Sequence, residues 1–569
     1  MKKTGTDFVK PYSEKFFGKS NTVQYIYPRE EMVKEAIFPY FVLDGGAFNL
    51  ACDRFGKVDG DDILEKVMSD ELFEEFILGG KYNWEKSFAY TGGTGFTRKF
   101  EWQIWPQRLY MILPLAHAYM RTGDRKYSDK WLETVHGWVD AHPYQEFDDS
   151  ISYFETDMVW RDMQVGWRTL SLLHSLFMLQ EAPYPEEEWK FLYDLVHLHA
   201  KHLYLEAKDR IARQHVQNHV LQLGTALMLA AVMFPEFDFS EEMLEMGKDT
   251  VKMNMQGIYP EGGSDEDSPS YSHFIARLYL EAYLLLKNNN LPQIDGLHDS
   301  IVNQYRWIWL NITPIGNVPR ISDSYSIDSV ADIERVKRLI DLDLPSERTS
   351  VFFPANNYAV LRKGDLVLYV DALDQYAGHR HWGRPQILLY CGKTPVLVDG
   401  GCCNYDRWEM YLELRSMPYH NVVYSPLINI KNYERGKITS KISHYDGDSV
   451  AFEAHISYEN VEYDWKRTLR LTEDKLIIDD CAVSDKEIPW RSHLLFSQQD
   501  TNIDSDNQLR QMTFDYIMTM TTDLPYEKML MPVMNDNNKI DYAVVAESND
   551  VGKEYRNHIE LSFEKREIK

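Results

Sequence analysis

Cysteine is scarce in this chain. Its 569 residues include five cysteines, an odd number that no spacing rule pairs. A disulfide-stapled fold is therefore not expected, and no Cys-x-x-Cys zinc motif is present. Sparing use of cysteine fits a reducing compartment, so we expect a cytoplasmic protein, or a periplasmic or secreted one if a signal segment has been removed.

Long apolar runs are absent as well. The longest, Leu223 to Phe234, is too short to cross a bilayer and predicts a buried helix instead. The first residues, Met1 to Asp7, include two lysines but no apolar stretch follows them, so they do not form a secretory signal. We therefore expect no membrane span.

Positive charge is the third shortage. Lysine and arginine number 61 against 88 aspartates and glutamates, which gives a formal net charge of −27. Binding to a phosphate backbone needs a basic face, so this balance argues against nucleic acid as a partner. Any anionic substrate must be held by local cations within a cleft.

Apolar and aromatic side chains are abundant, at 44% and 13% of the residues, which indicates a folded protein of two or three domains. After an N-terminal extension over residues 1–30, residues 31–345 show the apolar spacings of three and four that are typical of helices. The clearest helices are expected at Trp105–Arg121, Arg125–Ala141, Met163–Leu179, Glu187–Ala207, Val220–Phe234 and His273–Asn288. Short turns join them, so we predict helical hairpins that close into an (α/α) toroid or incomplete barrel.

Residues 350–569 change to short strand-like runs joined by hairpin signals such as Lys363-Gly364-Asp365. Strands are expected at Tyr358–Leu361, Leu366–Val370, Ile387–Tyr390, Val396–Val398, Trp465–Leu471 and Leu476–Asp479. No helical crossover separates them, which predicts an antiparallel β-sandwich. The fold class is therefore multidomain α+β, and we expect the active site where the two domains meet, because clefts favour domain interfaces.

One group of residues in the sheet domain suits a metal. His379 and His381 are two positions apart, so on a strand their side chains point to the same side. Asp399 and His420 could join them from neighbouring strands, and this set suits a divalent metal such as zinc, with one histidine left for chemistry. A His-x-His pair in a sheet is also often only a solvated or hydrogen-bonded face.

The helical domain offers two weaker signals. Asn218 and His219 place an amide and an imidazole side by side near a helix start, an arrangement that more often serves capping and packing. Tyr271 ends a polar, glycine-containing loop, and such loops tend to expose a tyrosine. The same loop contains three consecutive acids at 265–267, which more often remain solvated.

Taken together, these motifs resemble the heparinase II/III-like polysaccharide lyases and the related alginate and oligoalginate lyases. The order is Asn218-His219, Ser268-Pro269-Ser270-Tyr271, His379-Arg380-His381, Leu397-Val398-Asp399-Gly400 and His420-Asn421-Val422. The resemblance extends to the stretch from Phe100 through Arg125, to Trp160–Arg168 and to Gly383–Val423, and so covers most of residues 95–425. Their order and separation carry it, rather than any single motif.

Lyases of this group cleave next to a uronic acid by β-elimination, in which the C5 proton is removed and the glycosidic oxygen leaves from C4. The resemblance implies that Asn218 and His379 hold and neutralise the uronate carboxylate, as amide and imidazole donors can. Tyr271 would be the general acid, and also the base when both groups lie on one face of the sugar. His219 would be the base for the opposite C5 epimer.

The resemblance also implies that His381, Asp399 and His420 bind a divalent metal, expected to be Zn²⁺, in a structural role. This chain departs from the commonest pattern, which has an aspartate shortly after the second histidine, whereas Trp382 to Pro385 follow it here. The pair Cys402-Cys403 lies just beyond Asp399 and leaves a thiolate as an alternative ligand.

Trp160 and Arg161 are candidates for substrate binding, although these residue types at helical spacing more often serve packing and a solvated face. The implied partner is an anionic oligo- or polysaccharide that contains uronic acid. Glycosaminoglycans of the heparosan, hyaluronan or chondroitin type are the first expectation and alginate is the second.

Two other classes stay open. A glycoside hydrolase on an α/α scaffold would act through two carboxylic acids, for which Asp265, Glu266 and Asp267 are candidates. A noncatalytic carbohydrate-binding protein would need no Tyr271 hydroxyl. The ultraviolet-absorbing product of elimination separates the lyase from both. The polymer, endo or exo action, sulfate tolerance and oligomeric state are left open by the sequence.

Overall fold

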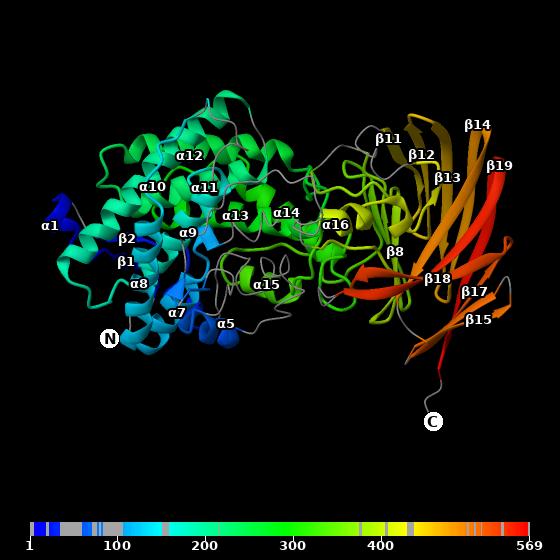
Figure 1. Ribbon diagram of the computed structural model, residues 1–569, viewed down its shortest axis with the longest axis horizontal. Helices are drawn as coiled ribbons and strands as arrows, with labels where there is room; N and C mark the ends of the chain where they lie inside the picture. Colours follow the sequence, from blue (N-terminus) through cyan, green and yellow to red (C-terminus); the bar gives the residue numbers. More distant parts are fainter. Residues whose placement is uncertain are drawn as a thin grey trace. The chain divides into compact units, whose positions relative to one another are not determined.

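The computed structural model describes residues 5–18, 22–34, 60–70, 77–78, 81–82, 106–148, 150, 159–214, 217–374, 378–403, 408–428, 437–497, 500–505, 508–513, 515–535 and 540–566. The chain forms two compact units. The helical unit comprises Met1–Gly257 and Phe274–Ile301, and the sheet unit comprises Ile258–His273 and Val302–Lys569. This mixture of an N-terminal helical region and a C-terminal antiparallel sheet confirms the α+β class (Figure 1). Phe100–Trp102 and Trp105 lie outside the described residues.

The helices of the helical unit closely follow the apolar periodicity of the sequence. The longer ones are α7 (Ile112–Thr122), α8 (Arg125–Ala141), α9 (Met163–Met178), α10 (Glu186–Ala212), α11 (Asn218–Met233), α12 (Ser240–Asn254) and α13 (Pro269–Asn288), which begins in the sheet unit. The Asp124 side chain starts α8 by accepting a hydrogen bond from the Lys126 amide. Among the described residues, no helix is long and apolar enough to cross a membrane.

Helix α11 is the buried centre of the helical unit. Every residue from Val220 to Met233 is buried, as expected for an apolar run without a polar face. Two glycines allow its close approach to α12: a Cβ on Gly224 would lie 2.8 Å from the Thr250 side chain, and one on Gly247 would lie 2.6 Å from Met228. Helices α9 and α10 pack on α11 as well (Figure 1). This packing fixes the start of α11, where Asn218 and His219 lie.

The strands of the sheet unit form one hydrogen-bonded antiparallel network. Its first part is β5 (Val351–Phe353), β6 (Tyr358–Lys363), β7 (Leu366–Asp371), β8 (Gln386–Cys391) and β9 (Thr394–Leu397), which pair in sequence order. The second part is β10 (Val423–Tyr424), β11 (Lys437–Tyr445), β12 (Ser449–Tyr458), β13 (Val461–Leu471), β14 (Lys475–Phe496), β15 (Asp500–Ser505), β16 (Gln508–Met512), β17 (Tyr516–Thr522), β18 (Tyr526–Met534) and β19 (Ile540–Lys565). Strand β14 joins the two parts through the pair Phe496–Leu397.

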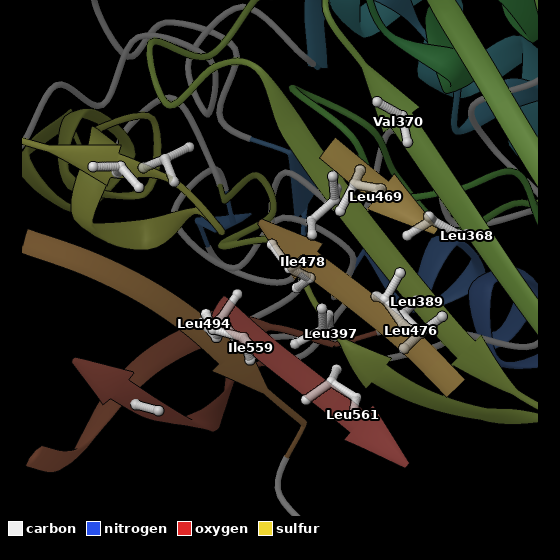
Figure 2. Packing of buried hydrophobic residues seen from close by; sticks show 14 of the residues in the cluster. Leu368, Val370, Leu389, Leu397, Leu469, Leu476, Ile478, Leu494, Ile559 and Leu561 are labelled. Carbon is white, nitrogen blue, oxygen red and sulfur yellow. The ribbon is translucent and has the colours of Figure 1, made fainter. Parts of the chain in front are cut away.

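Burial along these strands shows which faces meet. Strand β13 alternates strictly at its start between buried and exposed residues, so one face packs and the other meets solvent. Strands β7 and β8 are buried along their whole length. Figure 2 shows leucines of β7, β8 and β9 packed against those of β13, β14 and β19. His381, Asp399 and His420 lie in segments that connect these strands.

Short helical segments in the sheet unit carry connections between strands. They are α15 (Ser329–Val336), α16 (Trp408–Leu414) and η5 (Met417–Tyr419), and α14 (Leu297–Asn311) enters the unit from the helical one. Residue His420 follows η5 directly, and Asp399 follows β9 by two positions. Both are therefore placed by the ends of regular elements.

Candidate active site and metal centre

His381, Asp399 and His420 converge in the sheet unit. Nδ1 of His381 lies 3.1 Å from Nε2 of His420. The two carboxylate oxygens of Asp399 lie 3.7 and 3.6 Å from these nitrogens. The three residues are buried, and one ligand atom of each lies within 4.8 Å of the others. The structure therefore brings together the three residues that the sequence assigns to a metal.

Hydrogen bonds on the outer side of this triad leave three acceptors facing inward. His381 donates from Nε2 to a carboxylate oxygen of Asp323 at 2.9 Å, and His420 donates from Nδ1 to the Ser416 carbonyl at 2.7 Å. Since a carboxylate and a carbonyl only accept, the inner nitrogens bear lone pairs in the neutral rings. Burial lowers the pKa of His420 to about 4, which favours that neutral form.

The spacing of these acceptors fits a bound cation. Ligands of a tetrahedral zinc ion with bonds of about 2.1 Å stand about 3.4 Å apart, close to the observed separations. The Asp399 oxygens are fixed in turn by the Gly401 amide at 2.7 Å and the Gln386 side-chain amide at 2.8 Å. A Cβ on Gly383 would overlap the His420 ring, so only glycine leaves room for that ring. Two imidazoles and a carboxylate thus form a possible divalent-metal site.

The sulfur of the neighbouring Cys402 makes contacts away from the triad. Cys402 has its sulfur 3.4 Å from the Tyr325 hydroxyl and donates to the Cys403 carbonyl. Within the described part of the chain, the group that could hold a metal contains the two histidines and the aspartate and no thiol. Burial also raises the pKa of Cys402, which keeps its thiol protonated.

Asp323 connects the triad to the residues around Tyr271. Besides holding His381, its carboxylate accepts from the Tyr411 hydroxyl at 3.1 Å. Its amide donates to the His379 carbonyl at 3.1 Å. Its own carbonyl accepts from the Ser268 hydroxyl at 3.1 Å. Sequence reasoning missed this residue, since nothing in its neighbourhood along the chain indicates these contacts.

Tyr271 and His379 stack on each other. Their ring centroids are 3.6 Å apart and their planes differ by 24°. His379 donates from Nδ1 to a carboxylate oxygen of Glu266 at 2.7 Å, and its side chain is 16% exposed. Tyr271 lies in the first turn of α13, which begins at Pro269, four residues earlier than the sequence predicts. The Tyr271 phenol and the His379 imidazole thus lie side by side where solvent can reach them.

The acidic loop before α13 departs from expectation. The sequence predicts that its three acids are solvated, whereas Glu266 and Asp267 are buried. Asp267 pairs with the buried Arg384 at 2.5 Å, and Arg384 also binds Asp371 at 2.9 Å. The expectation is therefore wrong for two of the three, because partners distant along the chain compensate their charges.

Asn218 and His219 begin helix α11 in the helical unit. Asn218 is buried, while the His219 side chain is 30% exposed. His219 donates from Nδ1 to a carboxylate oxygen of Asp162 at 2.7 Å. Asp162 is a second residue that the sequence analysis did not single out.

Trp160 and Arg161 lie just before Asp162 and α9. The Trp160 ring is buried and packs on His199 and on the Arg168 guanidinium, whose carbon lies 4.8 Å from the ring centre. Arg161 donates to the Asp148 carbonyl at 2.6 Å. Their assignment to substrate binding stays a prediction.

Comparison with known proteins identifies the fold and the family of this chain. The fold is that of the crystal structure of heparinase III, with a TM-score of 0.71, 15% identity, and coverage of 89% of this chain and 84% of that one. The Heparinase II/III N-terminus model matches residues 53–345, and the Heparinase II/III-like C-terminal model matches residues 345–522. The chain belongs to the heparinase II/III-like family.

Two curated relatives share part of the sequence. A heparin-sulfate lyase of Pedobacter heparinus is 25% identical over 248 residues, which are 41% of this chain and 36% of that protein. A heparin-sulfate lyase of Bacteroides stercoris is 23% identical over 267 residues, 42% of this chain and 37% of that protein. The chain matches little more than a third of the length of either relative.

Proposed function

We propose that this protein is a lyase that cleaves a glycosaminoglycan next to a uronic acid by β-elimination. The observation that carries the proposal is the stacked pair of Tyr271 and His379, fixed by Glu266, in a member of the heparinase II/III-like family. The names of the two curated relatives favour a substrate of the heparan sulfate class. Alginate receives no comparable support.

The reaction has three requirements, and the chain offers a residue for each. The uronate carboxylate must be neutralised, for which His379 can donate from Nε2 while Glu266 holds Nδ1, and the Asn218 amide can add a second donor. The leaving C4 oxygen needs a proton, which the Tyr271 hydroxyl supplies. The C5 proton goes to Tyr271 when both groups lie on one face of the sugar, and to His219 for the opposite epimer.

The metal in this proposal is Zn²⁺ with a structural role, held by His381, Asp399 and His420. A bound cation would offset the three inward acceptors and fix the segment that carries His379, two residues before His381. The anionic substrate would be bound by cations within its cleft, for which Arg161 is one candidate. Trp160 is a candidate from the sequence alone, and its buried ring would support such a surface from behind.

The family assignment also supports a finer description of the two domains. We infer that the helices belong to an incomplete (α/α) toroid over residues 31–345 and that the strands of 350–569 form a sandwich. The change from one family model to the other at residue 345 supports these ranges. Packing of β7 to β9 against β13, β14 and β19 supports two layers.

A glycoside hydrolase receives less support. Two acids must be available to a glycosidic bond in that mechanism. Glu266 is bound to His379 and Asp267 to Arg384, so two of the three candidate acids already serve another side chain.

A panel of uronic-acid polymers and their oligosaccharides tests the proposal, with ultraviolet absorbance of the unsaturated product as the readout. We expect activity on a glycosaminoglycan, and Tyr271→Phe should lower kcat by at least about 10²-fold because it removes one acid–base group. Substrate binding should be largely retained, since the ring that stacks on His379 stays. A saturated product, or full activity of Tyr271→Phe, would refute the lyase assignment.

A further inference from the structure

We infer that Asp162 is a positioning residue that fixes the orientation and the tautomer of His219. This inference rests on the proposed function, in which His219 is the base for one C5 epimer. It adds a residue that decides which uronate epimers the protein can cleave.

The contact between the two side chains is specific and protected from water. Nδ1 of His219 lies 2.7 Å from Oδ2 of Asp162, and the Asp162 side chain is 3% exposed against 30% for His219. The carboxylate therefore meets the ring from the protein interior, while part of the imidazole stays accessible to a substrate. A buried carboxylate behind a histidine is the arrangement that orients a general base.

Asp162 departs from the usual role of its position. It is the N-cap residue of α9, where an aspartate normally accepts a hydrogen bond from the first turn, yet it makes no side-chain capping bond. Its backbone has φ 55° and ψ −146°, outside the regions that residues with a side chain readily adopt. The chain thus adopts an unfavourable conformation and gives up a cap, and the carboxylate contacts His219 instead.

Two residues of α10 hold Asp162 in place. The Asp162 amide donates to both carboxylate oxygens of Glu206, at 3.0 and 3.1 Å. Arg210, one turn further along α10, lies 3.1 Å from Glu206 and 3.8 Å from Asp162. Nε2 of His202 lies 3.8 Å from Glu206. Together with His219, these groups of α10 surround the two acids.

Glu206 and Asp162 differ in how readily they bear a negative charge. Burial raises the pKa of Glu206 to about 7, helped by the charge of Asp162. Burial acts in the same direction on Asp162, but His219 and Arg210 outweigh it and hold that pKa below its ordinary value. The negative charge therefore stays on the acid that contacts His219.

The chemical consequence concerns Nε2 of His219. With its proton on Nδ1 and shared with Asp162, the neutral ring has its lone pair on Nε2. That atom takes the C5 proton, the C5–H electrons form the C4–C5 double bond, and the C4–O bond breaks. The leaving oxygen takes the Tyr271 proton, and both residues then exchange protons with water. The imidazolium formed in this step is stabilised by the Asp162 carboxylate.

The test compares Asp162→Asn with the unaltered protein on tetrasaccharides that contain glucuronate or iduronate with matched sulfation. An asparagine amide would donate to Nδ1 and leave the proton on Nε2. We expect kcat to fall by about 10²- to 10⁴-fold for the epimer that uses His219. KM should stay within about threefold, as for a residue that acts mainly on the transition state. The rate for the other epimer should be retained.

The matched control is Asp124→Asn, because Asp124 is also an N-cap aspartate but caps its own helix. It should leave both rates unchanged. Equal rates for Asp162→Asn and the unaltered protein on both epimers would overturn the inference. An equal fall in kcat of Asp162→Asn on both epimers would also overturn it. The same holds if the unaltered protein cleaves only the epimer that does not use His219.

Nuclear magnetic resonance of the His219 ring tests the inference without enzyme activity and without a variant of Asp162. Ring ¹⁵N shifts of the unaltered protein, with His219 assigned through His219→Gln, should show the proton on Nδ1. A proton on Nε2 would overturn the inference. If no polymer yields an unsaturated product but the proton lies on Nδ1, the proposed function is wrong. The inference that Asp162 orients His219 is then still supported.

Discussion

Glu266 holds the imidazole of His379 by a hydrogen bond of 2.7 Å from Nδ1 to its carboxylate. The two residues are 113 positions apart in the chain, and Glu266 is buried. The carboxylate therefore sets which edge of the ring is available for other contacts.

Replacing Glu266 by glutamine should lower kcat on a glycosaminoglycan by about 10- to 150-fold, the value of a charged hydrogen bond of about 1.5–3 kcal/mol. Glutamine preserves the shape but removes the charge that orients His379. Initial rates from product absorbance measure the effect. Asp265→Asn, next to it and exposed, is the matched control and should retain full activity. An active Glu266→Gln would show that this pair is only structural.

Removing the metal should reduce stability before it reduces chemistry, because the triad is assigned a structural role. We expect close to one metal per chain by elemental analysis and a lower thermal midpoint after chelation.

Asp323→Asn should weaken metal binding by about 10- to 100-fold, since it releases the outer nitrogen of His381.

The control for Asp323 is Asp480→Asn, a buried acid of the sheet that binds Arg467 and not the triad. It should retain the metal. A metal-free protein that is as stable and active as the untreated one would contradict the structural assignment.

Alanine at position 383 should impair the metal centre, because its Cβ would overlap the His420 ring. We expect a lower thermal midpoint together with a lower metal content. Gly378→Ala provides the comparison, since its Cβ would meet none of the described residues within 4 Å. Equal metal content and stability in the two variants would show that the His420 ring can shift without loss.

Acid should weaken the fold through His117. Burial lowers the pKa of this ring to about 4 from 6.5, and it donates from Nε2 to the Met32 carbonyl. Between these pH values the unfolded chain binds a proton that the folded chain does not, so the free energy of unfolding falls as the pH falls. The full effect is about 3 kcal/mol, complete near pH 4 and absent well above 6.5.

Urea unfolding of the unaltered protein and of His117→Gln, from pH 7.5 to 4.5, isolates this contribution. The unaltered protein should lose stability more steeply than the variant as the pH falls. Parallel curves would mean that His117 is not the group responsible.

Local signals predicted the helices well. The sequence places a helix at Arg125–Ala141, and α8 has these bounds, because the Asp124 cap and the apolar spacing are both local. Helix α13 begins earlier than predicted, since Ser268 and Pro269 form its start. Strand β14 extends from Lys475 to Phe496, whereas only Leu476–Asp479 was predicted, because exposed charges interrupt its apolar pattern.

The candidate site was predicted in its principal residues and not in their partners. The order of motifs led to Tyr271, His379 and the metal triad. The sequence names Glu266 only as a candidate acid of a hydrolase and does not single out Asp162, because Asp162 and His219 are 57 positions apart and only the folded chain brings them together. Residue type alone did not distinguish Glu266 from its exposed neighbour Asp265.

Strand β14 connects both parts of the sheet network. Along one edge it pairs with β13, β10 and β9, and along the other with β19 over nearly its whole length. Detaching β14 would therefore separate both parts of the network at once. Amide hydrogens along β14 should exchange with solvent only in a single cooperative opening that also releases β9, the strand that ends beside Asp399.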